Sequence, residues 1–175
     1  MQRRRVLAAC ALSAARLVHA EAGFDVQPWP ANKPAPKELI SKETGERWDL
    51  AQWRGYAVML NFWASWCEPC RQEMPSLQRL SASRMAELKV LTVNLKDVPA
   101  TVDRFMTQTA LQLPVLRDSD GAIARKWGVR VFPSTVLIDS DGVVRSTVRG
   151  AIDWTGPAAH QLIRPLLKRA PAGAA

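Results

Sequence analysis

The chain has 175 residues, of which 47% are hydrophobic and 23% charged, with 9 Gly and 12 Pro. This composition excludes the disordered and collagen-like classes, and the length suits one domain with a packed core. The formal charge is +8, but four arginines lie within residues 1–20, so the remainder has 20 basic against 16 acidic side chains. Because this excess is small and no run of five like charges occurs, we expect no nucleic-acid partner.

Residues 1–20 are typical of a secretory signal peptide. Three arginines precede an apolar stretch, and Val18 and Ala20 supply the small or branched side chains at the positions that a signal peptidase tests. The apolar stretch is interrupted by Arg16 and is shorter than the roughly 20 residues that a membrane-spanning helix needs. A twin-arginine export signal and a lipobox ending at Cys10 are the alternatives. We expect a location in the periplasm or on the extracytoplasmic face, with membrane or lipid anchoring as the less favoured arrangement.

A proline-rich segment and a predicted β-hairpin follow the leader. Residues 21–35 are rich in proline, which disfavours a helix or a central strand, and we expect them to form a lead-in to a domain at 36–169. Residues 38–41 and 47–49 flank a turn with the sequence Glu-Thr-Gly-Glu and predict a small β-hairpin. A flexible tail is expected at 170–175.

Two β-α units and a second hairpin follow. The run at 57–63 is almost continuously apolar, as in a strand buried on both faces, and an amphipathic helix begins at Cys67. Further strands and helices are expected at 88–94, 100–110, 113–117 and 121–127, a hairpin at 135–149 and a last helix at 155–167. Because βαβ crossovers make parallel pairs and tight hairpins antiparallel ones, the order predicts an α/β fold with a mixed sheet.

Cys67 and Cys70 stand where the buried strand gives way to the first helix. At a helix N-terminus the free N–H groups and the dipole stabilise an anion, so we expect a lowered pKa for the Cys67 thiol and a role as nucleophile toward disulfides. Cys70 lies three residues on, on the same helical face, and can resolve a mixed disulfide. Pro69 falls in the first turn, where its missing N–H removes no helical hydrogen bond.

A zinc half-site and an inert structural disulfide are the alternative interpretations of this pair. Zinc prefers four ligands, but beyond the leader the sequence has no second cysteine pair and only His160 as a histidine. Closing a four-residue loop removes little entropy from the unfolded chain, so a purely structural disulfide gains little. We therefore expect no metal, and no cofactor other than a redox-active disulfide between Cys67 and Cys70.

Residues 61–70, with the sequence NFWASWCEPC, followed by Glu73 and Pro75, resemble the thioredoxin superfamily, and specifically its exported thiol-disulfide oxidoreductases of the TlpA, ResA and CcmG type. Residues 127–139 are similar to the segment that carries the family's cis-proline. The resemblance covers residues 36–169. It implies a thioredoxin-like three-layer α/β sandwich with an N-terminal β-hairpin and a βα insertion, acting as a reductase in the periplasm, often in cytochrome c maturation.

The resemblance also implies roles beyond the cysteine pair. Asn61 stands where cytosolic thioredoxins place a buried aspartate that accepts the proton of the second cysteine, which an amide cannot do. Glu73, one helical turn beyond Cys70, matches a glutamate near the active site of the exported proteins and is our candidate base. A solvated helix residue is the alternative. Pro133 resembles the cis-proline that faces the dithiol and the substrate, and Phe132 before it is larger than the residue often found there.

Two neighbours of the nucleophile, Trp66 and Glu68, complete the expected site. Trp66 is expected on the active-site surface as a substrate contact, with packing beneath the helix start as the alternative. Glu68 places a negative charge beside the Cys67 thiolate and opposes its stabilisation, which favours a reductase over a strong oxidant. The implied partners are protein disulfides, with apocytochrome c as one candidate, and a membrane electron donor of the DsbD or CcdA type. We expect a monomer.

Two other functions stay open for the same pair of cysteines. Within the enzyme class, a general disulfide isomerase or oxidase would use the same dithiol. From a different class, a copper-binding metallochaperone would exploit the preference of Cu(I) for soft thiolates. Such a site would recruit Met74 or Met85, and helical periodicity directs Met74 toward the core instead.

Overall fold

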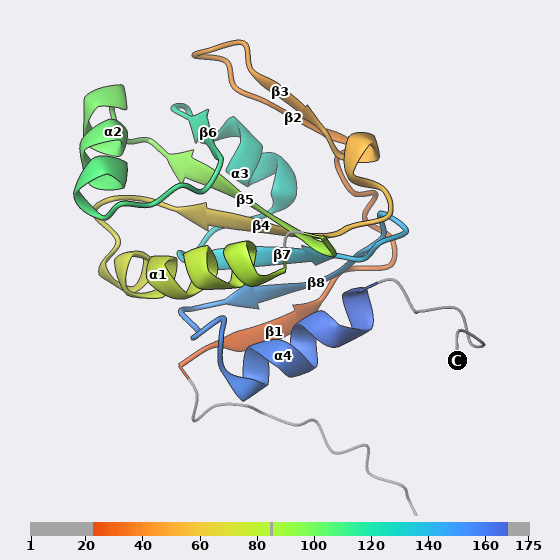
Figure 1. Cartoon of the computed structure of the whole chain (residues 1–175). Helices are drawn as coiled ribbons and strands as arrows, with labels where there is room; N and C mark the ends of the chain where they lie inside the picture. The colour runs from red at the N-terminus through yellow and green to blue at the C-terminus, as the bar shows by residue number, and fades with distance from the viewer. Residues whose placement is uncertain (1–22, 85, 168–175) are drawn as a thin grey trace, which may run out of the picture.

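The computed structural model describes residues 23–84 and 86–167. The leader expected at 1–20, the tail expected at 170–175 and Met85 lie outside the described residues. A six-stranded mixed sheet forms the centre, in the order β1-β8-β7-β4-β5-β6 (Figure 1). The strands are β1 (Asp25–Pro28), β4 (Ala57–Trp63), β5 (Leu88–Leu95), β6 (Val115–Asp118), β7 (Ser134–Ile138) and β8 (Val144–Arg149). Strands β4, β5 and β6 are parallel, whereas β7 is antiparallel to β4 and to β8.

Helices and a hairpin cover the two faces of this sheet and make three layers (Figure 1). The helices α1 (Glu68–Ser83), α2 (Pro99–Gln108) and α4 (Pro157–Ile163) pack on one face. The other face is covered by α3 (Ala122–Trp127) and by the hairpin of β2 (Glu38–Ile40) and β3 (Arg47–Asp49), after which the chain makes the 3-10 turn η1 (Leu50–Trp53). The expected three-layer sandwich with an N-terminal hairpin is confirmed, and α2, β6 and α3 between β5 and β7 contain the βα insertion.

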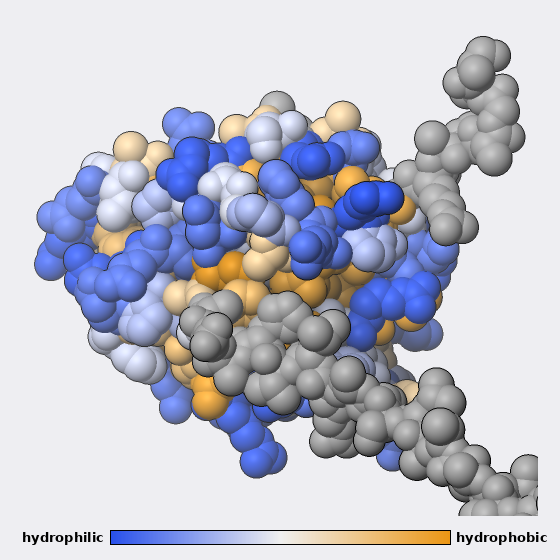
Figure 2. Space-filling model, turned by 90° about the horizontal axis from the view of Figure 1, so that it is seen from below, coloured by the Kyte–Doolittle hydropathy of each residue, from blue (hydrophilic) through white to orange (hydrophobic). Residues whose placement is uncertain are grey.

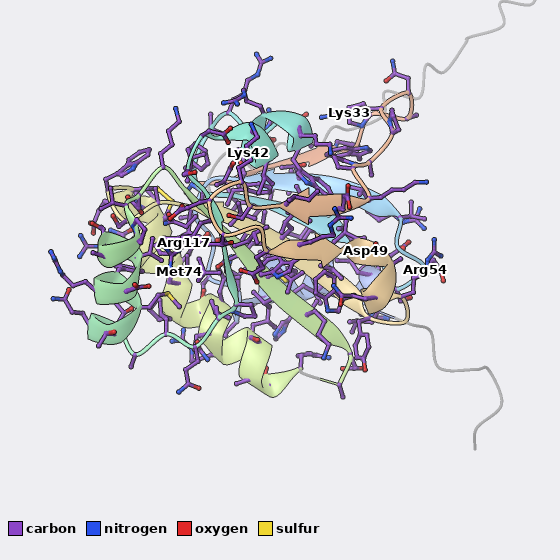
Figure 3. The ribbon with its side chains drawn as sticks, turned by 90° about the horizontal axis from the view of Figure 1, so that it is seen from above. Lys33, Lys42, Asp49, Arg54, Met74 and Arg117 are labelled. Atoms are coloured by element: carbon purple, nitrogen blue, oxygen red, sulfur yellow. A yellow bond between two sulfur atoms is a disulfide. The ribbon has the colours of Figure 1, made fainter. Side chains whose placement is uncertain are left out.

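Strand β4 carries the core of both layers. All seven of its residues are buried, as the continuous apolar run predicts, and successive side chains point to opposite faces. Met59 and Trp63 pack in the cluster under α1 and α2, while Leu60 and Phe62 pack in the cluster under α3 and the hairpin. Met74 on α1 is 1% exposed and lies in the first cluster, so its expected direction toward the core is confirmed (Figure 3).

The expected lead-in at 21–35 contains a strand that the sequence interpretation missed. Residues 25–28 form β1, which pairs antiparallel with β8 and places Val26 opposite Val148. The expectation for this segment disfavours a helix or a central strand, and β1 is neither, but it did not foresee an edge strand here. Proline is tolerated there because β1 is an edge strand and Pro28 is its last residue, where a missing ladder hydrogen bond costs little.

The last helix is shorter than its periodicity predicts. Helix α4 ends at Ile163, and residues 164–166 continue as a 3-10 turn, η2 (Arg164–Leu166). Pro165 explains the difference, because proline lacks the N–H of the helical ladder and its ring clashes with the preceding turn. The expectation that one helix runs to residue 167 is therefore wrong in its second half.

Two ion pairs fasten the tip of the β2–β3 hairpin to the insertion. Lys42 Nζ lies 2.7 Å from the carboxylate of Asp120, and Arg117 Nη1 lies 3.2 Å from that of Glu43 (Figure 3). Exposed pairs of this kind contribute about 1 kcal/mol or less each. The hairpin is held chiefly by Leu39 and Trp48, which are buried in the core.

The surface seen from below is mostly hydrophilic, with hydrophobic residues showing in patches between charged ones (Figure 2). The longest helix, α1, has 16 residues and alternates buried and exposed positions, so it is a surface helix of the domain. Across residues 23–84 and 86–167, none of the helices combines the length and the apolar character needed to cross a membrane.

Candidate active site

Cys67 and Cys70 form a disulfide at the start of α1, with their Cα atoms 5.3 Å apart. Strand β4 ends at Trp63, three residues lead out of the sheet, and Cys67 is the N-cap of the helix. The Cys67 Sγ atom accepts a hydrogen bond from the Cys70 backbone N–H at 3.3 Å. A free N–H of the first helical turn thus points at the sulfur that the sequence identifies as the nucleophile, which is the geometry that stabilises a thiolate.

The two sulfurs differ in how accessible their residues are. Cys67 is 6% exposed, whereas Cys70 is completely buried. A disulfide in a partner protein therefore reaches Cys67 first, and Cys70 is left to attack from inside the fold. This asymmetry supports the expected roles of the two cysteines.

Glu68 and Pro69 occupy the first turn, where both were expected. Pro69 falls among the positions whose N–H has no helical partner. The carboxylate of Glu68 is exposed and lies 3.8 Å from Arg71 Nη1. Arg71 was not among the predicted site residues. Its positive charge, one helical turn from Cys67, partly offsets the negative charge of Glu68.

Glu73 is buried in the interior beside the disulfide and is only 3% exposed. Its carboxylate accepts hydrogen bonds from Asn61 Nδ2 at 2.7 Å, the Ile152 N–H at 3.3 Å and Trp154 Nε1 at 3.2 Å. Burial raises the pKa of Glu73 from 4.5 to about 7, and the three donors only partly oppose that shift. The alternative of a solvated helix glutamate is therefore wrong.

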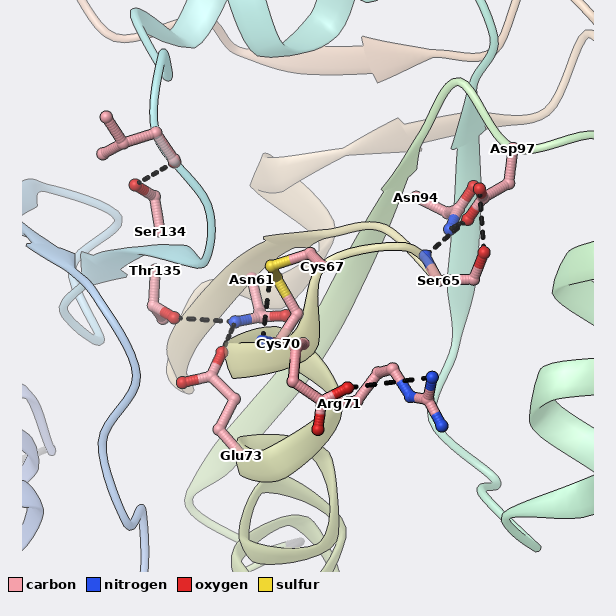
Figure 4. The surroundings of a disulfide bond; sticks show 12 residues. Asn61, Ser65, Cys67, Cys70, Arg71, Glu73, Asn94, Asp97, Ser134 and Thr135 are labelled. Carbon is pink, nitrogen blue, oxygen red and sulfur yellow. Dashed lines mark hydrogen bonds and ion pairs between the residues drawn. A yellow bond between two sulfur atoms is a disulfide. The ribbon is translucent and has the colours of Figure 1, made fainter.

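Asn61 connects strand β4 to this buried carboxyl group. Its side chain is completely buried and its Nδ2 donates both to Glu73 and to Thr135 Oγ1 at 2.9 Å (Figure 4). Thr135 is the residue paired with Asn61 across β4 and β7. The sequence interpretation treated Asn61 only as a missing base and did not include Thr135. The sequence feature that could have indicated this buried contact is the polar Asn61 within the otherwise apolar run at 57–63.

An aromatic surface lies beside the cysteines. The Phe132–Pro133 peptide bond is cis, as the resemblance implies, and the chain enters β7 directly after it. Trp66 is 63% exposed and its ring meets that of Phe132 edge-on, with centroids 6.3 Å apart. The alternative of Trp66 packed beneath the helix start is wrong. Val131 is also half exposed, so the site is bordered by apolar side chains.

A polar clamp holds the loop that delivers Cys67, and the sequence interpretation missed it. Asp97, just after β5, accepts hydrogen bonds from the Ser65 N–H at 2.7 Å and from Ser65 Oγ at 2.9 Å (Figure 4). Asn94 Nδ2 donates to the same carboxylate at 2.7 Å. Asp97 is a positioning residue, because it fixes the backbone two residues before the nucleophile.

A cavity of about 600 Å³ opens between α1 and the segment at 151–158. Glu73 lies on its wall with Ser76, and Arg79 and Asp153 also line it. The cavity gives the buried carboxyl group a way to exchange protons with solvent. Within the part of the chain that the structure describes, no group of three or more His, Cys, Asp or Glu side chains is placed to hold a metal ion.

Comparisons with known proteins identify the family of this chain. The model of the AhpC/TSA family matches residues 31–147. A thiol-disulfide oxidoreductase ResA from Bacillus thuringiensis subsp. konkukian is 32% identical over 119 residues, which cover 67% of this chain and 69% of the relative. The family model thus matches more than half of the chain.

Solved structures give the same result. A putative thiol:disulfide interchange protein DsbE from Chlorobium tepidum superimposes with a TM-score of 0.65 at 32% identity, covering 77% of this chain and 94% of that one. The exposed lipoprotein thioredoxin Etrx1 from Streptococcus pneumoniae superimposes with a TM-score of 0.58 at 29% identity, covering 74% and 98%. The chain therefore belongs to the thioredoxin-like AhpC/TSA family and is a thiol-disulfide oxidoreductase of the ResA and DsbE type.

Proposed function

We propose that this enzyme reduces disulfides of substrate proteins outside the cytoplasm. The observation that carries the proposal is the asymmetric pair at the start of α1. Cys67 is reachable, and Cys70 is buried one helical turn from a carboxyl group, Glu73, with a pKa of about 7. An acid–base group with a pKa near working pH is suited to moving the proton of a buried thiol.

The reaction consists of two exchanges. The Cys67 thiolate attacks a substrate disulfide, forms a mixed disulfide and releases one substrate thiolate. Glu73 then accepts the proton of Cys70, and the Cys70 thiolate attacks Cys67 Sγ. The mixed disulfide breaks, the Cys67–Cys70 disulfide forms, and the second substrate thiolate leaves. Two electrons pass from the enzyme to the substrate.

The aromatic surface is the proposed contact for the substrate. Trp66 is exposed next to Cys67 and its ring meets that of the partly buried Phe132, so an extended segment of a partner would lie against this apolar border. A protein disulfide flanked by apolar residues fits it best. From the resemblance we carry over an apocytochrome c as one candidate substrate and a membrane electron donor of the DsbD or CcdA type.

The proposed location has two supports. Residues 1–20 are typical of a secretory signal. The similar protein from Streptococcus pneumoniae is an exposed lipoprotein. In an oxidising compartment a reductase must be recharged by an electron donor, which is why the proposal includes one.

The reduction potential of the Cys67–Cys70 couple tests the direction of electron flow. Because Glu68 disfavours the Cys67 thiolate, we expect a value nearer the about −270 mV of thioredoxin than the about −120 mV of DsbA. Equilibration of the full chain with glutathione gives the potential, and an insulin-reduction assay gives the activity. A potential above about −180 mV would favour an isomerase or oxidase. Anaerobic titration of the reduced protein with Cu(I) tests the metallochaperone alternative in the same samples.

A further inference from the structure

The nitrogen of the Asn61 side-chain amide is hydrogen-bonded within the described part of the chain, whereas its oxygen is not. Its Nδ2 donates to Glu73 and to Thr135, whereas its Oδ1, also buried, has no hydrogen-bond partner among the residues that the structure describes. A buried carbonyl oxygen without a donor costs about 1–3 kcal/mol, so native structures rarely leave one unpaired. Asn61 Oδ1 is one of four buried and unpaired side-chain atoms among the described residues, and it is the one whose amide is bonded to Glu73, so it is free to accept a donor that the oxidised state does not supply.

That donor appears when the disulfide is reduced. In the present state Cys70 has no hydrogen on sulfur. Reduction by two electrons and two protons breaks the S–S bond and gives Cys70 a thiol in a completely buried position. Cys70 and Glu73 are three residues apart on the same face of α1, and the Asn61 amide is hydrogen-bonded to Glu73, as the close-up of the disulfide in Figure 4 shows. A thiol is a weak donor that a carbonyl oxygen can accept.

We propose that Asn61 Oδ1 accepts a hydrogen bond from the Cys70 thiol in the reduced enzyme. One amide then holds both groups between which the proton moves, with Cys70 at its oxygen and Glu73 at its nitrogen. The inference rests on the proposed roles of Cys70 and Glu73 and adds to them a third residue that touches the reacting thiol. When Cys70 gives its proton to Glu73 and attacks Cys67, the bond to Asn61 is lost.

The bond makes Asn61 a determinant of the redox equilibrium. The hydrogen bond forms only in the reduced state. In the oxidised state Oδ1 is buried and unpaired, so the dithiol is favoured over the disulfide. Replacing the amide by an apolar side chain of similar size removes both the bond and the unpaired oxygen. We expect Asn61→Leu to shift the thiol–disulfide equilibrium toward the disulfide by about tenfold, which is about 30 mV for a two-electron couple.

Thr135→Val is the matched control. It removes the acceptor of one Nδ2 hydrogen bond and leaves Oδ1 unchanged. The lost bond joins Asn61 Nδ2 to Thr135 Oγ1 and does not involve Cys70, so we expect its removal to affect both redox states alike. Both variants are equilibrated with glutathione at about pH 5.5, where Glu73 is protonated and its ionisation does not enter the comparison. We expect the potential of Thr135→Val to equal that of the unaltered chain.

The S–H stretching band reports the bond directly. In the full chain with Cys10→Ser and Cys67→Ser, Cys70 is the single remaining thiol. A hydrogen-bonded S–H absorbs at lower wavenumber and more intensely than a free one, so infrared difference spectra of this chain should show a displaced band. Adding Asn61→Leu should move the band to the free position, and adding Thr135→Val should not.

Three results would overturn the inference. One is a free-thiol band in the chain with native Asn61, a measurement that needs no Asn61 variant to fold. The others are an unchanged potential in Asn61→Leu and an equal shift in both variants. Glu73→Gln distinguishes failure of this inference from failure of Glu73 as the base. If Glu73 is not the base, its replacement leaves the rate of mixed-disulfide resolution unchanged, and the S–H band still reports the hydrogen bond to Asn61.

Discussion

Replacing Glu73 by glutamine tests how the buried carboxyl group makes the stability of the protein depend on pH. The pKa of Glu73 is raised by burial from 4.5 to about 7. The native state therefore binds this proton more tightly than the unfolded chain does. Its contribution to stability is fully present below about pH 4.5 and is lost as the pH rises through about 7.

The size of this effect follows from the two pKa values. One unit corresponds to 1.36 kcal/mol, so the proton contributes about 3 kcal/mol at most, and about 2.5 kcal/mol of it disappears between pH 5 and pH 8. Glutamine has no ionisation to lose. The difference in unfolding free energy between Glu73→Gln and the unaltered protein should therefore change by about 2–3 kcal/mol in favour of the variant over that range.

Urea unfolding of the oxidised proteins at pH 5 and pH 8 measures this difference. When the glutamine amide nitrogen takes the place of Glu73 Oε2, the hydrogen bonds from the Ile152 N–H and from Trp154 Nε1 are both lost, but the variant bears that loss at both pH values. Glu68→Gln on the same helix is the matched control, because it removes an exposed carboxylate and keeps the buried one. Parallel pH profiles for Glu73→Gln and the unaltered protein would refute the assignment of a buried proton to Glu73.

The same variant and four others test the chemistry. Glu73→Gln should slow resolution of a preformed mixed disulfide about 10²-fold or more, measured by stopped-flow release of a labelled substrate. Cys67→Ser should abolish disulfide reduction, whereas Cys70→Ser should trap substrates as mixed disulfides; if Cys70 reacts first with a limiting alkylating agent, these roles are reversed. Asp97→Ala should cost about 1–3 kcal/mol of stability by urea unfolding and slow alkylation of reduced Cys67, and unchanged alkylation would show that the clamp does not position it. Trp66→Ala should raise KM for a protein disulfide but not for oxidised glutathione, and equal effects on both would contradict a role in protein recognition.

Local patterns in the sequence determined most of the elements and the nucleophile. A seven-residue apolar run predicts β4, the spacing of Met74, Leu77 and Leu80 predicts α1, and both depend on neighbours within a few turns. The position of Cys67 between these two elements places it at a helix N-terminus, and its chemistry follows from that position alone. The boundaries were less certain where proline acts, as in α4 and at the edge strand β1.

Only the tertiary structure decided the environment of the second cysteine. Two of the three donors to Glu73 come from residues 79 and 81 positions away along the chain, and Ser65 is anchored by Asp97 from 32 positions away. No local pattern encodes such partners, because they meet only when β4, β5, β7 and α1 have packed into one core. Burial likewise depends on the whole fold, and it is burial that converts an ordinary helix glutamate into a group that holds its proton near neutral pH.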